Sequence, residues 1–134
     1  MNSLRLTRLV LACSVPTLIV CTVILHYSYG LVRVPAGMDT MVETHPPGTL
    51  CVIEKSPGSL PANSVVFVDL PDGSTVLTRA VAVNADGGID IRHDNRASRF
   101  QYLESAGPYP LQAVRGHVLS FFLPDPKGAP DLGQ

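Results

Sequence analysis

A long apolar run near the N-terminus is the strongest pattern in the sequence. Residues 9–25 (LVLACSVPTLIVCTVIL) carry no charged side chain, and the residues up to Val32 add few polar positions. A stretch of this length can cross a bilayer as a helix with some help from the interfacial region. The proline within the run, Pro16, is tolerated in helices that are embedded in lipid. The pattern therefore predicts a single transmembrane helix in contact with membrane lipid.

The charges that flank this run predict its orientation. Arg5 and Arg8 precede the apolar segment, and positively charged flanks stay on the cytoplasmic side. We therefore expect residues 1–8 in the cytoplasm and residues 9–29 as a single-pass anchor in the inner (cytoplasmic) membrane. The rest of the chain then lies on the periplasmic or extracytoplasmic side.

Two other interpretations of the same segment are weaker. A cleaved signal peptide needs small residues before the cleavage point, and Ser28-Tyr29-Gly30 is only a loose match. A lipoprotein would be cleaved before Cys13. Too few apolar residues precede Cys13, and the apolar run continues well past it. We therefore favour an uncleaved anchor.

After Val34 the pattern changes to short β-branched runs that are separated by turn residues, such as Pro71-Asp72-Gly73. Such runs predict strands. The expected strands are 49–54, 64–69, 75–83, 89–92 and 116–122. No strong helical periodicity lies between them. The sequence therefore predicts a mainly β domain over residues 30–123, an antiparallel sheet folded into a small barrel or sandwich. Residues 124–134 are rich in Pro and Gly and are expected to be a disordered tail.

Charge and cysteine content exclude several classes of protein. The formal net charge is −1 and no stripe of Lys and Arg is present, which argues against nucleic-acid binding. Cys13 and Cys21 lie in the apolar run, apart from Cys51, so no disulfide framework is expected. No Cys/His spacing fits a zinc site. We therefore expect neither a metal nor a cofactor.

A dense polar cluster, His93-Asp94-Asn95-Arg96, follows the strand expected at 89–92. It can be a local turn in which Asx side chains bond the backbone and Arg96 or Arg99 pairs nearby. It can also contribute to a site. The other histidines, His26, His45 and His117, are scattered along the chain, and an isolated histidine is more often structural than catalytic.

Five segments carry motifs in a recognisable order. Segment 35–48 (PAGMDTMVETHPPG) is similar to P-S-x-S-M-x-P-T-L-x-x-G-D, with Met41, Thr44 and Gly48 at matching positions. Segments 63–67 (NSVVF) and 78–82 (TRAVA) are similar to G-D-V-V-V-F and K-R-V-V-G. Segments 93–99 (HDNRASR) and 107–118 (GPYPLQAVRGHV) are similar to G-D-N-x-x-x-S-x-D-S-R and G-P-V-P-x-x-x-I-x-G-x-V.

In this order the motifs resemble the type I signal peptidase family over about residues 5–123. The resemblance extends to the small processing peptidases of conjugative transfer systems, which have one anchor and a minimal β domain. It implies a signal-peptidase-like β fold and serine-type cleavage of signal peptides from exported precursor polypeptides, without a cofactor. Secretion or conjugation machinery is the implied partner.

The resemblance also implies site residues. It places Thr40 at the position of the family's serine nucleophile and Thr78 at the position of its lysine base. The residues that correspond to the family's substrate-binding segments are Met41, Asp94, Asn95 and Ser98.

Both positions that should perform the chemistry differ from the family. A threonine hydroxyl at position 78 cannot accept a proton near neutral pH, and the guanidinium of Arg79 stays protonated. A shifted alignment leaves other combinations open. In these, Thr44 or Ser64 is the nucleophile and His45 or His93 is the base.

Two functions follow from these observations. The first is a signal-peptidase-like protease with Thr40 at the nucleophile position. The second is a catalytically inactive homologue that binds extended peptides by strand addition, or that serves as a subunit of a secretion or conjugation assembly. A transcription repressor with a self-cleaving β domain is set aside, because the anchor occupies the place of its DNA-binding domain.

Overall fold

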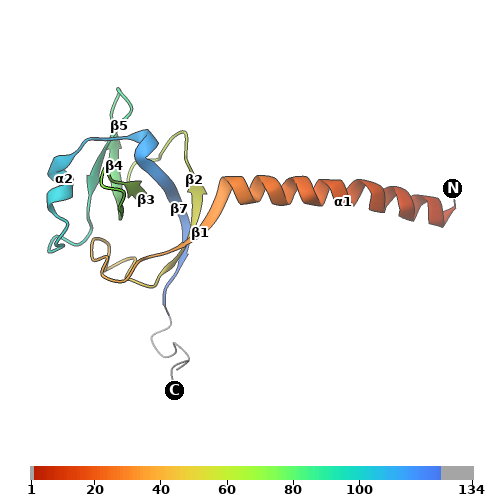
Figure 1. Cartoon of the computed structure of the whole chain (residues 1–134), viewed down its shortest axis with the longest axis horizontal. Coiled ribbons are helices and arrows are strands. Elements are labelled where there is room, and N and C mark those ends of the chain that lie inside the picture. Colours follow the sequence, from red (N-terminus) through yellow and green to blue (C-terminus); the bar gives the residue numbers. More distant parts are fainter. Residues whose placement is uncertain (1, 125–134) are drawn as a thin grey trace, which may run out of the picture.

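The computed structural model describes residues 2–124, so the predicted disorder of residues 125–134 lies outside the described part of the chain. Helix α1 (Ser3–Ser28) is long and apolar enough to cross a membrane, and none of its residues is buried against the domain (Figure 1). Its threonines bond within the helix. Thr17 Oγ1 donates to the carbonyl of Cys13 at 2.7 Å and Thr22 Oγ1 to that of Leu18 at 2.8 Å. These bonds satisfy the hydroxyls without water, as an apolar environment requires.

The domain that follows α1 is mainly β, as predicted. Its strands are β1 (Tyr29–Arg33), β2 (Leu50–Lys55), β3 (Ser64–Asp69), β4 (Thr75–Val83), β5 (Gly88–Arg92), β6 (Tyr109–Pro110) and β7 (Val114–Phe122). The helices are α2 (Tyr102–Ala106) and the 3-10 turn η1 (Leu111–Ala113). The strands form one antiparallel sheet of seven strands in the order β1-β2-β7-β3-β4-β5-β6. The five expected strands are all present, whereas β1, β6 and α2 were not expected.

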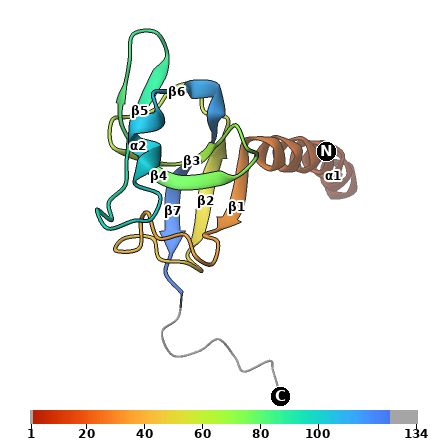
Figure 2. The same ribbon diagram turned by 60° about the vertical axis from the view of Figure 1, so that its left-hand side comes forward.

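Apolar side chains are buried on both faces of the central strands. Along β3, Val66 and Val68 belong to one buried cluster, and Val65 and Phe67 belong to another. A strand that is covered on both faces has a continuous apolar sequence rather than an alternating one, and β3 reads SVVFVD. The sheet curves so strongly that β3 and β4 run across the direction of β2 and β7 (Figure 2). This curvature allows both faces of β3 to be covered by other parts of the domain.

A fork between β3 and β7 is the feature of the sheet that positions the candidate site. On one edge, β7 pairs with β2 from Gly116 to Phe122. On its other edge, β7 pairs with β3 only from Val114 to His117. Beyond His117 the two strands diverge, and within residues 2–124 no strand pairs with the edge of β7 at 118–122.

Close packing of β7 on β2 requires a glycine at position 116. A Cβ atom built there would lie 2.6 Å from Ile53 Cδ1 and 3.0 Å from Ile53 Cβ. We predict that Gly116→Ala lowers the free energy of unfolding by about 1–3 kcal/mol, the usual cost of an overpacked core. Urea denaturation of the full chain in detergent micelles measures this change.

Gly58→Ala is the matched control, because no atom lies within 4 Å of a Cβ at that position. Its effect should stay within about 0.5 kcal/mol. Equal unfolding midpoints for the two variants would contradict the packing account.

Candidate functional site

Two of the motif segments are bonded to each other. The carboxylate of Asp39 accepts hydrogen bonds from Ser98 Oγ at 2.6 Å and from the amide of Arg99 at 3.1 Å. Asn95 donates its side-chain amide to the carbonyl of Asp39 at 2.8 Å and its backbone amide to the carbonyl of Thr40 at 2.9 Å. The bond from Ser98 is the main reason why the pKa of Asp39 lies below its ordinary value. Asn95 and Ser98 therefore hold the loop that carries Thr40.

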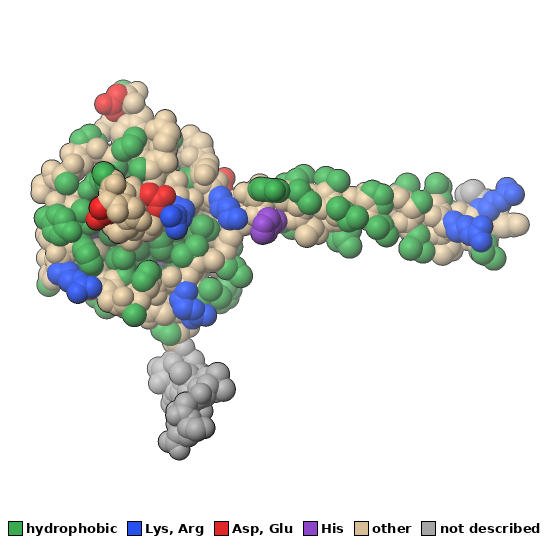
Figure 3. Space-filling view, viewed as in Figure 1, with side chains coloured by type: hydrophobic (Ala, Val, Ile, Leu, Met, Phe, Trp, Pro, Cys, Tyr) green, Lys and Arg blue, Asp and Glu red, His purple; other side chains and the backbone are tan. Residues whose placement is uncertain are grey.

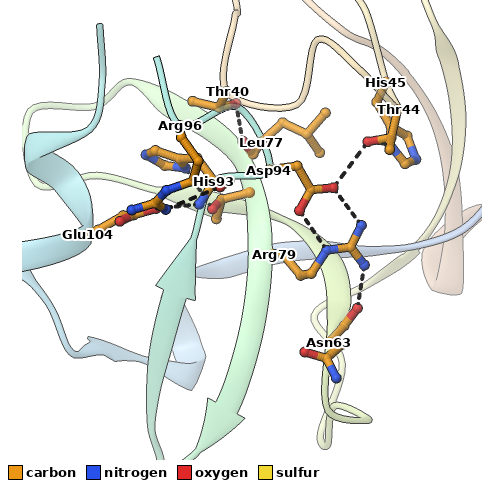
Figure 4. Close-up of polar contacts among 11 residues, drawn as sticks. Thr40, Thr44, His45, Asn63, Leu77, Arg79, His93, Asp94, Arg96 and Glu104 are labelled. Carbon is orange, nitrogen blue, oxygen red and sulfur yellow. Dashed lines mark hydrogen bonds and ion pairs between the residues drawn. The ribbon is translucent and has the colours of Figure 1, made fainter. Parts of the chain in front are cut away.

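Thr40 is completely buried, and its hydroxyl donates to the backbone carbonyl of Leu77 in β4 (Figure 4). The pairing of β4 with β5 begins at Arg79 opposite Arg92, so β5 does not reach Leu77. Buried backbone and hydroxyl groups both need hydrogen-bond partners. This bond satisfies the buried hydroxyl of Thr40, whose proton points at the backbone rather than at a base.

Thr78 is also completely buried, and its hydroxyl contacts a histidine. Thr78 Oγ1 lies 2.8 Å from His93 Nδ1, and His93 Nε2 lies 3.0 Å from the carbonyl oxygen of Phe100. A carbonyl only accepts, so Nε2 carries the proton and, in the neutral ring, Nδ1 accepts from Thr78. His93, which is itself completely buried, therefore bonds to Thr78 and to the backbone.

The structure thus places Thr40 beside the backbone of Thr78 without joining the two hydroxyls. Within residues 2–124, no hydrogen bond connects Thr40 with Thr78 or with a basic side chain. Met41 is buried in the apolar cluster with Cys51, Phe67 and Leu77. The roles that the resemblance assigns to Thr40, Thr78 and Met41 stay predictions, and the contacts made here are those of structural residues.

A bidentate ion pair joins Arg79 of β4 to Asp94. Arg79 Nε and Nη2 donate to the two carboxylate oxygens at 2.9 and 2.7 Å. The third nitrogen, Nη1, donates to the carbonyl of Asn63 at 2.7 Å. The bonds from Arg79 lower the pKa of Asp94, and the bond to Asp94 raises the pKa of Arg79. From the sequence, Arg79 was considered only as a possible base. The ion pair could have been expected, because Arg79 lies in one motif segment (78–82) and the acidic residue Asp94 lies in the next (93–99).

Thr44 and His45 lie on the other side of Asp94. Thr44 Oγ1 is 3.3 Å from Asp94 Oδ2 and 3.0 Å from His45 Nδ1. Thr44 is exposed, whereas His45 is buried and packs its ring on Phe121 with 4.2 Å between ring centroids. Burial is the main cause of a lowered pKa for His45, so its ring is neutral near pH 7. The single hydroxyl proton of Thr44 therefore has two possible acceptors, His45 and Asp94.

These side chains form one wall of a cleft at the fork between β3 and β7. The cleft has a volume of about 300 Å³. Its lining residues are Thr44, His45, Val65, Arg79, Val118, Leu119 and Phe121. We call it the β3–β7 cleft.

Ser64, the other alternative nucleophile, lies at the start of β3, but its hydroxyl donates a hydrogen bond to the carbonyl of Pro61. Of the alternatives from the shifted alignment, only Thr44 and His45 thus meet at a surface cleft.

Comparisons with protein-family models, with curated proteins and with solved structures found no significant match to this chain. Within residues 2–124, no three His, Cys, Asp or Glu side chains gather into a group that could hold a metal ion. The resemblance to type I signal peptidases therefore stays a prediction from the motifs.

The lowered pKa values predict how stability depends on pH. Asp39, Asp94 and His45 all have folded-state pKa values below their ordinary values, so the unfolded chain binds more protons than the folded chain. Stability then rises with pH. The contribution of His45 is complete above about pH 6.5, and those of the two aspartates are complete above about pH 4. Each contribution is lost as the pH falls through the folded-state value.

We predict that Asp94→Asn destabilises the domain at pH 7 by roughly 1–3 kcal/mol, because Arg79 loses a charged acceptor. The variant should also lose less stability than the wild type between pH 5 and pH 3. Urea unfolding at a series of pH values measures both effects. Glu43→Gln, at an exposed carboxylate of the same loop, is the control. An Asp94→Asn variant with the pH dependence of the wild type would refute the role of the ion pair.

Proposed function

We propose that this chain is a signal-peptidase-like membrane protein that binds extended segments of exported polypeptides in the β3–β7 cleft. In this proposal the domain is a small barrel of the signal peptidase type on the outer face of the cytoplasmic membrane. The observation that carries the proposal is the edge of β7 at residues 118–122, which borders the cleft and with which no strand among residues 2–124 pairs.

The order of the elements supports the family assignment. The membrane-spanning segment leads within a few residues into the loop that carries Thr40, and that loop is bonded to the 93–99 segment by Asp39, Asn95 and Ser98. The motif resemblance requires these two segments to form one site. The strong curvature of the sheet fits a barrel (Figure 2). Arg5 and Arg8 support the orientation with the domain outside the cytoplasm.

The edge of β7 has what strand addition requires. An extended peptide that pairs with an open sheet edge gains main-chain hydrogen bonds, and pockets beside the edge select its side chains. Val65, Leu119 and Phe121 supply apolar walls at this edge. All three guanidinium nitrogens of Arg79 are already bonded, and Asp94 neutralises its charge. The cleft therefore suits uncharged, apolar side chains.

Binding without cleavage is favoured over catalysis at Thr40. A nucleophile needs an accessible oxygen and a base that takes its proton. Thr40 is completely buried and donates to a backbone carbonyl, and the partner of Thr78 is a buried histidine. This arrangement supplies neither requirement at the predicted dyad.

Slow processing by Thr44 is a second candidate, and a separate observation favours it. The exposed hydroxyl of Thr44 lies at the cleft, 3.0 Å from Nδ1 of the neutral His45 ring. The ring can accept the proton while Oγ1 attacks a peptide carbonyl, and the protonated ring then gives that proton to the leaving amine as the C–N bond breaks. Water, deprotonated by the same ring, then hydrolyses the ester. The backbone amides of Thr44 and His45 both donate to the carbonyl of Met41, so they do not serve as oxyanion donors. Any such cleavage is expected to be slow.

Binding is tested with the full chain in nanodiscs and a fluorescein-labelled peptide that is extended, apolar and rich in small residues. Fluorescence anisotropy should show saturable binding by the wild type. Phe121→Asp and Leu119→Asp should each weaken it by about tenfold or more, which corresponds to about 1.4 kcal/mol. Val83→Asp, at an exposed position at the end of β4, should bind like the wild type. Unchanged affinity in both cleft variants would eliminate the proposed site.

Cleavage is tested on an exported precursor by mass spectrometry of the products. Binding without chemistry predicts intact precursor with the wild type and with every variant. Products that disappear with Thr44→Ala but persist with Thr40→Ala would establish the second candidate. Products that disappear only with Thr40→Ala would show that the position implied by the resemblance is catalytic after all.

A further inference from the structure

Strand β1 forms one end of the sheet, and its outer edge is open. β1 pairs with β2, and within residues 2–124 no strand lies on its other side. Open edges attract further strands, so proteins usually protect them with proline, with bulges or with a covering segment. β1 (YGLVR) contains no proline and pairs with β2 without a shift of register. Two of the usual protections are therefore absent from this edge.

The hydrogen bonds to β2 show which residues present main-chain groups at the open edge. In an antiparallel pair, alternate residues direct both their N–H and their C=O towards the partner strand. The amide of Val34, the residue after β1, donates to the carbonyl of Thr49 at 2.8 Å. Every second residue before Val34 then also bonds to β2. The residues that turn their main-chain groups to the open edge are Tyr29, Leu31 and Arg33.

The side chains of the same three residues select a partner strand. All three are exposed, with Leu31 at 66%. An antiparallel copy of β1 that is centred on Leu31 would set Tyr29 of each strand opposite Arg33 of the other. A guanidinium beside a tyrosine ring is a favourable pair, whereas like charges that lie directly opposite each other destabilise a sheet. Side-chain complementarity therefore favours a second copy that is centred on Leu31, and charge disfavours one that is centred on Arg33.

This register also satisfies most of the open main-chain groups. Leu31 would exchange two hydrogen bonds with Leu31 of the second copy. The amide of Arg33 would donate to the carbonyl of Tyr29 on the other strand. The amide of Tyr29 needs no further acceptor, because it already donates to the carbonyl of Leu25 in α1.

The direction of α1 allows two anchored copies to pair in this way. β1, β2 and β7 overlap in Figure 1 and lie side by side in Figure 2, so Figure 1 shows this part of the sheet nearly edge-on. There α1 extends from one face of the sheet, on the side away from the rest of the domain, and it stands clear of the domain (Figure 3). The twofold axis that relates two antiparallel strands of one sheet is perpendicular to that sheet. The axis therefore runs along α1, and both helices leave the paired sheet in the same direction.

The connection between α1 and the sheet is rigid enough to preserve this direction. β1 begins at Tyr29, directly after Ser28, the last residue of α1. Lys55 Nζ, at the end of β2, also donates to the carbonyl of His26 in the last turn of α1 at 2.8 Å. In the register centred on Leu31, the two copies of Tyr29 lie about 13 Å apart along the strands. Packed helices need only about 8–10 Å, so both copies of α1 have room.

We propose that two copies of this chain in one membrane pair through β1, antiparallel and centred on Leu31, to form one continuous sheet. This inference depends on α1 spanning the membrane, as the proposed function assumes, but it does not depend on peptide binding. In the strand order, β2 and β7 separate β1 from the β3–β7 cleft. Each copy therefore keeps the open edge of its own β7.

Disulfide trapping of the full chain in lipid vesicles tests the pairing. Cys13 and Cys21 are replaced by alanine, and the buried Cys51 is kept. Leu31→Cys in this background should form a disulfide-linked dimer on oxidation. Its two Cα atoms would lie about 5.5 Å apart, which is within the range of a disulfide. Val83→Cys, at the exposed end of β4, is the control and should stay monomeric.

Two further experiments test the register and the edge. Tyr29→Cys and Arg33→Cys, reconstituted together, should form a mixed disulfide, whereas neither should form one with its own copy about 13 Å away. Leu31→Pro removes an amide that faces the open edge, a change that edge strands tolerate. Native mass spectrometry from nanodiscs should show dimers of the wild type and loss of dimers for Leu31→Pro, and urea unfolding reports whether that variant is folded.

Three results would overturn the proposal. The first is a Leu31→Cys variant that forms no more dimer than Val83→Cys, a readout that does not require the proline variant to fold. The second is a disulfide of Tyr29→Cys or of Arg33→Cys with itself in place of the mixed one. The third is a folded Leu31→Pro variant that remains dimeric, since a contact through α1 would then hold the copies together.

Discussion

The bidentate ion pair between Arg79 and Asp94 is the contact on which the rest of the site depends. It joins the middle of β4 to the segment that follows β5, with both side chains mostly removed from solvent at 27% and 22% exposure. From this attachment, Asn95 and Ser98 reach the loop at Asp39 and fix it. Oδ2 of the same carboxylate lies 3.3 Å from the hydroxyl of Thr44 at the cleft. Loss of either charge would leave the other partly buried without a partner, which is costly.

The cleft itself is a consequence of how the sheet curves. The register of β7 shifts by one residue opposite the Phe67–Val68 step of β3 and again opposite the Val52–Ile53 step of β2. The extra residues, Arg115 and Leu119, both lie in β7, and such bulges bend the strand that carries them. Gly116 allows Ile53 to approach β7 closely at this point. Past His117 no residue of β3 pairs with β7, and this edge of β7 borders the cleft. The polar wall with Arg79 and the apolar wall with Phe121 then face the same space. The proposed binding of an extended chain uses this edge and not the predicted dyad, whose two threonines are buried.

Part of this structure could be predicted from the sequence, because the signals were local. The apolar run of 9–25 and the β-branched runs at 49–54 and 64–69 gave the helix and strands directly. Strand β1 could not be separated from the apolar run that precedes it, since both are apolar and contiguous. The contacts between the Thr40 loop and the 93–99 segment join residues more than fifty positions apart, and they are known only from the structure.

The contacts that decide the chemistry were not local. The hydrogen bond between Thr78 and His93 joins two positions fifteen residues apart across a β-hairpin. The hydroxyl of Thr40 donates to the backbone carbonyl of Leu77, and a sequence motif does not indicate a bond to the backbone. The register of β4 against β5, interrupted between Ala80 and Ala82, sets which side chains face each other. Periodicity does not specify such an irregularity, so the burial of both threonines emerged only from the structure.

Amide hydrogen exchange along β7 tests the central claim most directly, because it reports on the edge that the peptide is proposed to occupy. The full chain in nanodiscs would be compared with and without a saturating apolar peptide. The account predicts slower exchange at residues 118–122 on addition of peptide. It also predicts unchanged exchange at residues 114–117, where β3 already pairs with β7. Bound peptide with unchanged exchange at residues 118–122 would contradict the account.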